Sequence, residues 1–159
     1  MPKVYLPPTA DELFHSHSDM TRQVEELESH ALALRSADGD EQAMILDDLV
    51  DFATQFSAHV RGHIIEEEND LFPRCRPHLT ASAQAMLHRI QDQHRELETS
   101  IDTLMGRLET AQNSEEDLNK DLIDSIYVRA QLLRYNFNTH SIAEREFFEE
   151  VIRYINRGG

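Results

Sequence analysis

The sequence has little of what several structural classes require. Among its 159 residues are one cysteine, five glycines, five prolines and no tryptophan. The single cysteine, Cys75, cannot form an intramolecular disulfide and has no second thiol for a cysteine-type zinc site, which suits a reducing compartment. So few glycines and prolines leave little material for the many turns of an all-β fold, whereas Leu, Ala, Glu, Gln and Arg favour helices. The composition therefore predicts an all-α protein.

Basic residues and long apolar runs are also scarce. Lys and Arg number 15 against 30 Asp and Glu, which gives a formal net charge of −15 at pH 7. This charge disfavours nucleic acid or an anionic membrane surface as a partner and favours a cation. No apolar run approaches the roughly 20 residues that a membrane span needs, and the first residues lack a stretch suited to secretion. We therefore expect a soluble, cytoplasmic protein with no nucleic-acid or membrane partner.

The length and the apolar pattern predict a single domain over residues 1–159. A hydrophobic content of 40% is enough for one continuous core. Apolar residues recur every three or four positions in four separate runs, which is the period of an amphipathic helix. These runs predict helices over about 9–37, 40–72, 80–110 and 115–157. Because the connections are short, the helices should pack as antiparallel neighbours in an up-down-up-down four-helix bundle.

Local signals mark where these helices begin and end. Thr9 can cap the first helix while Glu12, three residues on, bonds back to it. Gly39 can take the left-handed conformation that ends this helix. Pro73 should end the second helix, because proline lacks a backbone N–H and clashes with the preceding turn. Ser114 can cap the fourth helix.

Each apolar stripe is interrupted by a histidine on the same face. The four interrupting residues, one per helix, are His17, His63, His94 and His140. In the second and fourth helices a glutamate, Glu67 or Glu144, follows the histidine one turn later. With a rise of about 1.5 Å per residue the positions lie at similar depth, provided that the fourth helix starts later than Ser114 or overhangs the bundle. We therefore expect them to meet in one polar layer of the core.

Two glutamates in such a layer predict a bound cation. Buried carboxylates are costly unless they are paired or bind a metal. A lone core histidine usually needs only a hydrogen bond, but four histidines at one depth with two carboxylates do not fit that interpretation. Mixed imidazole and carboxylate ligands suit iron, manganese or zinc, and the repeated carboxylate suggests two metal ions bridged by Glu67 and Glu144.

These residues resemble the hemerythrin-like, or HHE cation-binding, domains. The resemblance covers nearly the whole chain and rests on one motif in each predicted helix. The motifs are His17; HIIEEENDLFP, with His63 and Glu67; His94, followed by Leu97 and Ile101; and HSIAEREFF, with His140 and Glu144. The resemblance implies a non-haem centre of two iron ions held by the four histidines and two glutamates. It further implies that the glutamates bridge the ions and that one iron is open to a small ligand such as O₂, NO or peroxide.

The sequence departs from the oxygen-carrying hemerythrins of invertebrates. Those have two histidines one turn apart in the third helix and an aspartate ending the motif of the fourth. Here the neighbours of His94 at that spacing are Ile90 and Glu98, so that Glu98 becomes a further candidate ligand, and Glu144 ends the last motif. The chain is more similar to the broader bacterial type, and a dedicated O₂ carrier is not implied.

The residues leave the functional class open. A module that binds or senses a small ligand, redox state or iron level needs the same centre as a di-iron enzyme acting on peroxide or NO. A structural zinc bundle accepts the same ligands but gains nothing from a bridged pair. Ferritin-like oxidases use Glu-x-x-His pairs, and the only match here is Glu12 to His15. The oligomeric state is open too, a homodimer being one alternative.

His59 is a hypothetical seventh ligand. It precedes His63 by one turn on the predicted stripe, and from there it could complete the shell of the iron that His17 and His63 hold. The alternative is a polar core residue. Glu66 and Glu68 flank the second-helix glutamate and are expected to face solvent, although either could accept a hydrogen bond from a ligand histidine.

Overall fold

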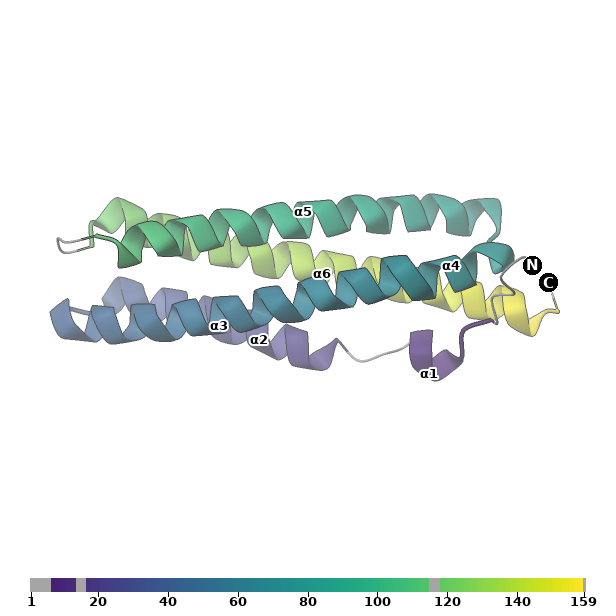
Figure 1. Ribbon diagram of the computed structural model, residues 1–159, viewed down its shortest axis with the longest axis horizontal. Helices are drawn as coiled ribbons and strands as arrows, with labels where there is room; N and C mark the ends of the chain where they lie inside the picture. The colour runs from purple at the N-terminus through teal and green to yellow at the C-terminus, as the bar shows by residue number, and fades with distance from the viewer. Residues whose placement is uncertain (1–6, 14–16, 115–117, 159) are drawn as a thin grey trace.

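Four long helices lie side by side in the computed structural model, which describes residues 7–13, 17–114 and 118–158 (Figure 1). They are α2 (Ser18–Ser36), α3 (Gly39–Glu66), α5 (Ala81–Gln112) and α6 (Lys120–Asn156). A short helix, α1 (Ala10–Leu13), precedes α2. Between α3 and α5 the chain continues as the π-helix η1 (Glu67–Leu71), then α4 (Phe72–Cys75) and the 3₁₀ turn η2 (Arg76–His78). No strand occurs in these described ranges, and the all-α class is confirmed.

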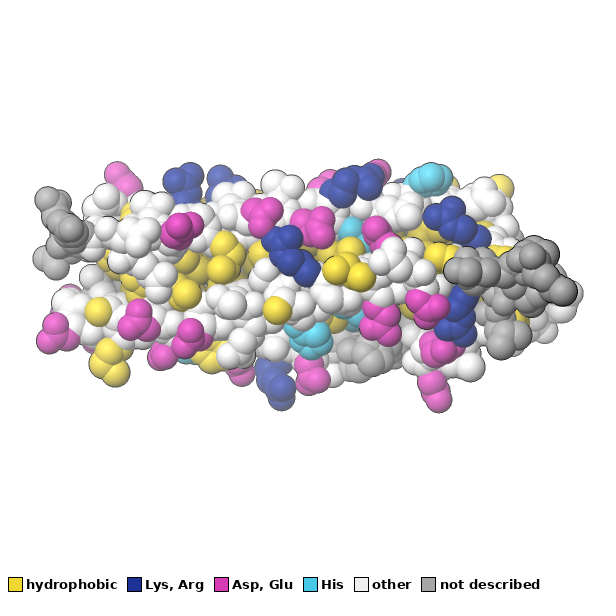
Figure 2. Space-filling model, viewed as in Figure 1, with side chains coloured by type: hydrophobic (Ala, Val, Ile, Leu, Met, Phe, Trp, Pro, Cys, Tyr) yellow, Lys and Arg dark blue, Asp and Glu magenta, His cyan; other side chains and the backbone are white. Residues whose placement is uncertain are grey.

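The long helices form a closed ring around the core. α2 packs against α3 and α6, and α5 packs against the same two helices. Successive long helices are joined at alternating ends of the molecule (Figure 1). Acidic side chains are spread along the length of the face seen in Figure 2. None of the described helices is long and apolar enough to cross a membrane.

A layer of buried polar residues divides the apolar core in two. One cluster of buried apolar side chains ends, and the other begins, about two to three turns away on each of three helical segments. The flanking pairs are Ile64 and Leu71, Leu97 and Ile90, and Phe137 and Phe147. Between them lie the buried polar residues of the chain's described part, Glu67, His94, His140 and Glu144. The fold therefore places its polar groups in one cross-section of the bundle.

α1 begins with the predicted capping box. The Thr9 hydroxyl accepts a hydrogen bond from the Glu12 N–H at 3.2 Å, and the Thr9 N–H donates to Glu12 Oε2 at 2.7 Å. The side chain of Leu13, the last residue of α1, is buried in the apolar cluster at this end of the bundle. The cap thus holds a helix of a single turn, and Leu13 anchors it to the core.

The first predicted helix, over about 9–37, is interrupted, and its expected continuity was wrong. α2 begins only at Ser18, with His17 as its N-cap. Residues 14–16, which include His15, lie outside the described ranges. His17 therefore stands at a helix end, and its carbonyl oxygen accepts the first backbone bond of α2 from the Thr21 N–H at 2.8 Å.

Gly39 has the predicted positive φ of 41°, but it is the first residue of α3 and not the end of α2. The last turn of α2 is followed by Ala37 in an extended conformation. Ala37 and Asp38 are both extended and connect the two helices, and Gly39 with its positive φ begins α3.

Pro73 does not end the helical backbone, contrary to the prediction. In the π-helix η1 the Phe72 N–H bonds to the Glu67 carbonyl oxygen, five residues back. This wider turn restarts the bonding pattern, so Pro73 occupies the first turn of α4, where a missing N–H costs nothing. The backbone then stays helical to Cys75.

The fourth long helix begins later than Ser114. α6 starts at Lys120, and Asn119 caps it by accepting a hydrogen bond from the Leu122 N–H at 2.7 Å. Ser114 lies just beyond the end of α5 and is not the cap. For His140 to lie at the depth of the other histidines, the fourth helix had to start later than Ser114 or overhang the bundle. The later start is confirmed.

Candidate metal centre

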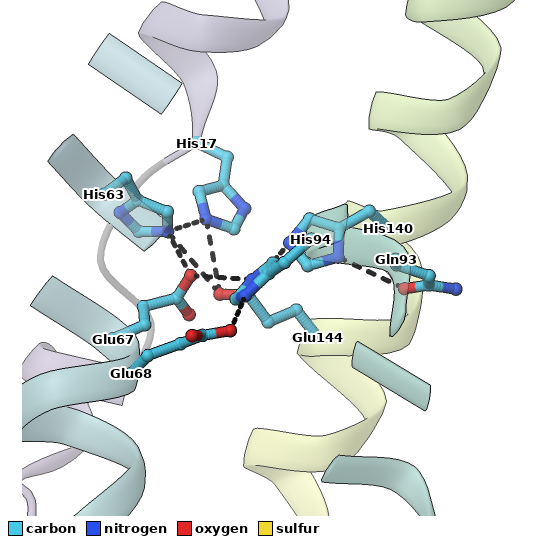
Figure 3. Close-up of polar contacts among 8 residues, drawn as sticks. All are labelled: His17, His63, Glu67, Glu68, Gln93, His94, His140 and Glu144. Atoms are coloured by element: carbon cyan, nitrogen blue, oxygen red, sulfur yellow. Dashed lines mark hydrogen bonds and ion pairs between the residues drawn. The ribbon is translucent and has the colours of Figure 1, made fainter. Parts of the chain in front are cut away.

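Four histidines and two glutamates converge in the polar layer of the bundle (Figure 3). They are His17 at the N-cap of α2, His63 in α3, Glu67 in η1, His94 in α5, and His140 and Glu144 in α6. The residues from η1, α5 and α6 are at most 2% exposed, whereas the side chains of His17 and His63 are 16% and 13% exposed. The structure thus brings together six of the seven residues that the sequence singled out.

The donor atoms fall into two groups that share Glu144. In the first group, His17 Nε2 lies 2.8 Å from His63 Nε2, and Glu144 Oε1 is 3.5 and 3.6 Å from these nitrogens. The second group consists of Glu67, His94, His140 and Glu144. Here Glu144 Oε2 lies 2.5 Å from His140 Nε2. Within each group the donor atoms all lie within 4.8 Å of one another, which is close enough for one metal ion.

Each glutamate reaches histidines on both sides. Glu144 directs one oxygen to the pair His17 and His63 and the other to His140. Glu67 Oε1 lies 2.9 Å from His63 Nε2 and 3.5 Å from His94 Nε2. A carboxylate that bridges two metal ions needs this placement between two sets of imidazoles.

Several buried polar atoms in the layer have no hydrogen-bond partner in the described part of the chain. Both carboxylate oxygens of Glu67 and of Glu144, together with His94 Nε2, are in this state, as is the Ser141 hydroxyl. The carboxylates lie close to imidazole nitrogens, but these contacts lack hydrogen-bond geometry. Each such group costs about 1–3 kcal/mol when left unsatisfied. A cation bound between them supplies the missing partner, so the residues fit a metal.

The close contacts between histidines and glutamates shift the pKa values of three residues in the layer. Burial disfavours protonation of His63, but close contacts with Glu144 and Glu67 outweigh it and raise its pKa to about 10. Burial and the neighbouring Glu144 raise the pKa of Glu67. Burial opposes ionisation of Glu144 too, yet its contacts with Glu67 and His140 hold its pKa well below the usual range. The metal-free layer thus retains protons that a cation would displace.

A sequence model of the hemerythrin HHE cation-binding domain matches residues 9–152. The chain belongs to this family. All the converging residues lie within the matched region. Comparisons with curated proteins and with solved structures gave no match.

In this hemerythrin-like domain, two further side chains contact the Nδ1 atoms of two of the histidines, which face away from the centre. The Nδ1 atom of His94 lies 2.8 Å from Glu68 Oε1, and the Nδ1 atom of His140 lies 3.1 Å from Gln93 Oε1. Because an oxygen can only accept here, each Nδ1 carries the proton, which leaves Nε2 as the nitrogen that faces the centre. Such contacts orient metal-binding imidazoles and raise their basicity.

Of the two glutamates that flank Glu67, Glu66 is exposed, as expected. Glu68 instead accepts a hydrogen bond from His94, which was the alternative for these residues. Glu68, in the π-helix η1, is half-buried, and its carboxylate faces the outer nitrogen of His94. Gln93 had not been considered a functional residue. Its only sequence signal is its place directly before His94, which does not distinguish it from any polar neighbour.

His59 is not part of the site in this domain. Its side chain is exposed, and its Nδ1 lies 3.0 Å from Gln23 Oε1. A helix turns by about 100° per residue, so a step of four residues leaves His59 about 40° farther from the core than His63, which already stands at the edge. Val60 takes the core position instead. The ligand hypothesis for His59 was therefore wrong, and Glu98 likewise belongs to neither donor group.

Proposed function

We propose that the protein is a non-haem di-iron protein that binds or senses O₂ or another small ligand such as NO or peroxide. In an up-down-up-down bundle of hemerythrin type, the iron ions would be held by the two donor groups described above. His17 and His63 would bind one ion, and His94 and His140 would bind the other, with Glu67 and Glu144 as bridges. Iron is favoured over zinc or manganese by the family and by the repeated carboxylate between imidazoles.

The observation that carries this proposal is the state of the two glutamates. Both are 1% exposed, both lack hydrogen-bond partners in the described chain, and each approaches histidines of both groups. Two carboxylates at the centre of a core, surrounded by imidazoles, require a positive charge that no described Lys or Arg supplies there. One metal ion would satisfy one donor group, and two would satisfy both.

A pair of iron ions supplies redox chemistry and an open coordination position for a small ligand. We infer that this position lies beside His17 and His63. The side chains of His17 and His63 are 16% and 13% exposed, whereas His94 and His140 are at most 2% exposed. The ring of Phe137 lies 6.1 Å from that of His17, so an apolar wall borders this side and suits an uncharged ligand such as O₂ or NO.

The test is to produce the protein with iron, purify it without air, and measure metal content and the optical spectrum before and after exposure to air. We expect two irons per chain and new charge-transfer absorption upon oxidation, which decays or changes when NO is added. A colourless protein that retains zinc from an iron-supplemented culture, or a protein with a single metal per chain, would reject the di-iron proposal.

A further inference from the structure

A cavity of about 110 Å³ joins the buried centre to the surface between α1 and η1. Its inner wall includes His63, Glu67 and Glu144, which belong to the candidate metal centre. Leu71 and Phe148 form apolar parts of the wall. The space is sufficient for several water-sized groups, since one water needs about 10–15 Å³ of such volume. The cavity thus extends from the surface to the side chains of both glutamates, whose carboxylate oxygens are themselves buried.

The outer wall of the cavity is acidic. It is formed by Glu12, Glu66 and Asp70, and among the described residues of the lining Arg74 carries the one fixed positive charge. The Arg74 guanidinium donates to both oxygens of Glu12, at 3.0 and 2.8 Å, and lies 3.5 Å from Asp70. One guanidinium cannot neutralise three carboxylates, so the outer wall keeps a net negative charge at neutral pH.

A second opening reaches the centre from the other side of Leu13 and has a different charge. This groove, of about 560 Å³, extends to His17 and Glu144. Among the described residues, the charged side chains in its outer wall are those of Arg22 and Arg145 against Glu25. The described wall of this opening therefore attracts cations less than the acidic wall does.

We propose that the acidic cavity is the path by which a divalent metal ion enters the centre. In this mechanism Glu66 and Asp70 capture the hydrated ion at the surface. Glu67 and Glu144, whose oxygens are buried and unpartnered at the inner end, then take it over. Arg74 acts as a charge that slows uptake. The inference rests on the proposed function, since it assumes that these two glutamates bind metal.

The negative charge of the outer wall is the physical reason for metal entry through this cavity. A cleft lined by one sign of charge raises the local concentration of the opposite ion and increases its association rate, by roughly 10-fold or more in strong cases. The effect acts over a Debye length of about 8 Å at 0.15 M salt, so it belongs to carboxylates at the mouth and not to the net charge of the chain. Removal of Glu66 and Asp70 should slow uptake without changing the bound state, because neither belongs to a donor group of the centre.

The experiment mixes the full-length, metal-free protein with Co²⁺ at about 0.1 M salt, where the Debye length is about 10 Å, and follows the visible absorption of the bound ion in a stopped-flow instrument. The variant Glu66→Gln/Asp70→Asn is compared with Asp48→Asn/Asp51→Asn. The control pair lies on exposed positions of α3, roughly 22 Å along the helix from Glu66, and removes the same charge. Circular dichroism verifies that each protein is helical before mixing.

We expect the cavity variant to bind Co²⁺ about threefold more slowly or worse, while the control keeps the native rate and both reach the native stoichiometry. At about 0.5 M salt the difference should disappear. Arg74→Gln should change the rate in the opposite direction and bind Co²⁺ faster at low salt, which tests the proposal even if the double variant folds poorly.

Equal rates for the cavity and control variants, or no acceleration in Arg74→Gln, would overturn the uptake path. In either case the proposed function would stand, provided that two ions still bind. A native protein that binds no Co²⁺ would instead reject the metal centre itself, so the two failures are distinguishable.

Discussion

At the scale of single residues, Glu144 connects the two halves of the centre. Its two oxygens approach different histidines, His63 and His17 on one side and His140 on the other, and it is shared by both donor groups. Glu67 has a similar position between His63 and His94. A side chain that serves two ions is harder to replace than one that serves a single ion.

Glu67→Ala and Glu144→Ala should each lower the metal content from two ions per chain toward one or none. The reason is that, in the proposed di-iron centre, each substitution would remove a donor from both ions at once. Metal analysis after dialysis measures the effect, with Glu66→Ala as the exposed neighbouring control. Retention of two ions in both variants would exclude bridging by these residues.

Glu68→Gln should weaken metal binding by roughly 10- to 100-fold while the fold persists. The carboxylate of Glu68 accepts from His94 Nδ1 at 2.8 Å, and an amide at this position supplies a weaker, uncharged acceptor. Competition with a coloured chelator measures the affinity. Glu98→Gln is the matched control, because Glu98 is also half-buried near His94 but belongs to neither donor group. Equal affinities in the two variants would leave Glu68 without a role at the metal.

At the scale of secondary-structure elements, the centre combines regular helices with a helix start and a π-helix. His63, His94, His140 and Glu144 lie within α3, α5 and α6. His17 stands at the start of α2, and Glu67 and Glu68 stand in the π-helical η1. The site therefore depends on the height at which these separate elements meet.

The short helix α1 should detach from the bundle in acid. The ion pair with Arg74 and the capping bonds with Thr9 lower the pKa of Glu12 from 4.5 to about 2. Because this pKa is lower in the folded protein than in the unfolded chain, folding favours the ionised form. The contribution of Glu12 to stability is therefore present above about pH 4.5 and is lost as the pH falls toward 2.

Urea unfolding midpoints of the native chain and of Glu12→Gln, measured from pH 7 down to pH 3, test this expectation. The difference between them should be largest near neutral pH and should shrink below about pH 4.5. Asp11→Asn is the control, since it removes a neighbouring charge but leaves the bonds to Arg74. A difference that stays constant across this pH range would show that the ion pair does not contribute.

At the scale of the whole molecule, the polar layer interrupts an otherwise continuous apolar core. Apolar clusters lie on both sides of it, and the described buried atoms without partners are concentrated in it. Two buried carboxylates in a medium of low polarity are costly unless a cation pairs with them. The bundle and the metal should therefore stabilise each other.

Removal of the metal should lower the melting temperature by roughly 5–10 °C. A ligand at 100 times its dissociation constant stabilises the folded state by about 2.7 kcal/mol, and 1 kcal/mol shifts the melting point of a chain of this size by about 2–4 °C. Thermal melts monitored by circular dichroism, with and without a chelator, measure this shift. The metal-free Glu67→Gln/Glu144→Gln variant should melt no lower than the metal-free native protein, since it carries no buried carboxylate charge. Identical melts of the native protein with and without metal would show that the layer is not strained.

The sequence alone determined the helical class and predicted the six residues that converge in the polar layer. Within a helix the geometry is local, so a histidine on an apolar stripe and a glutamate one turn later must share a face whatever surrounds them. The capping box of Thr9 and Glu12 is local in the same way and formed as predicted. The interrupted stripes therefore identified His17, His63, His94 and His140 before any helix was placed.

Only the tertiary structure decided how far each helix extends, how it is rotated and what lies across from it. His59 and Val60 differ by one step of rotation, and the packing of α3 on its neighbours determines which of them is buried. The contact of His140 with Gln93 joins residues that are far apart in sequence, as does that of Glu12 with Arg74. Such contacts depend on which helices adjoin and at what height. A rotation of a few tens of degrees, which the apolar period of a single chain cannot resolve, is enough to make or remove them.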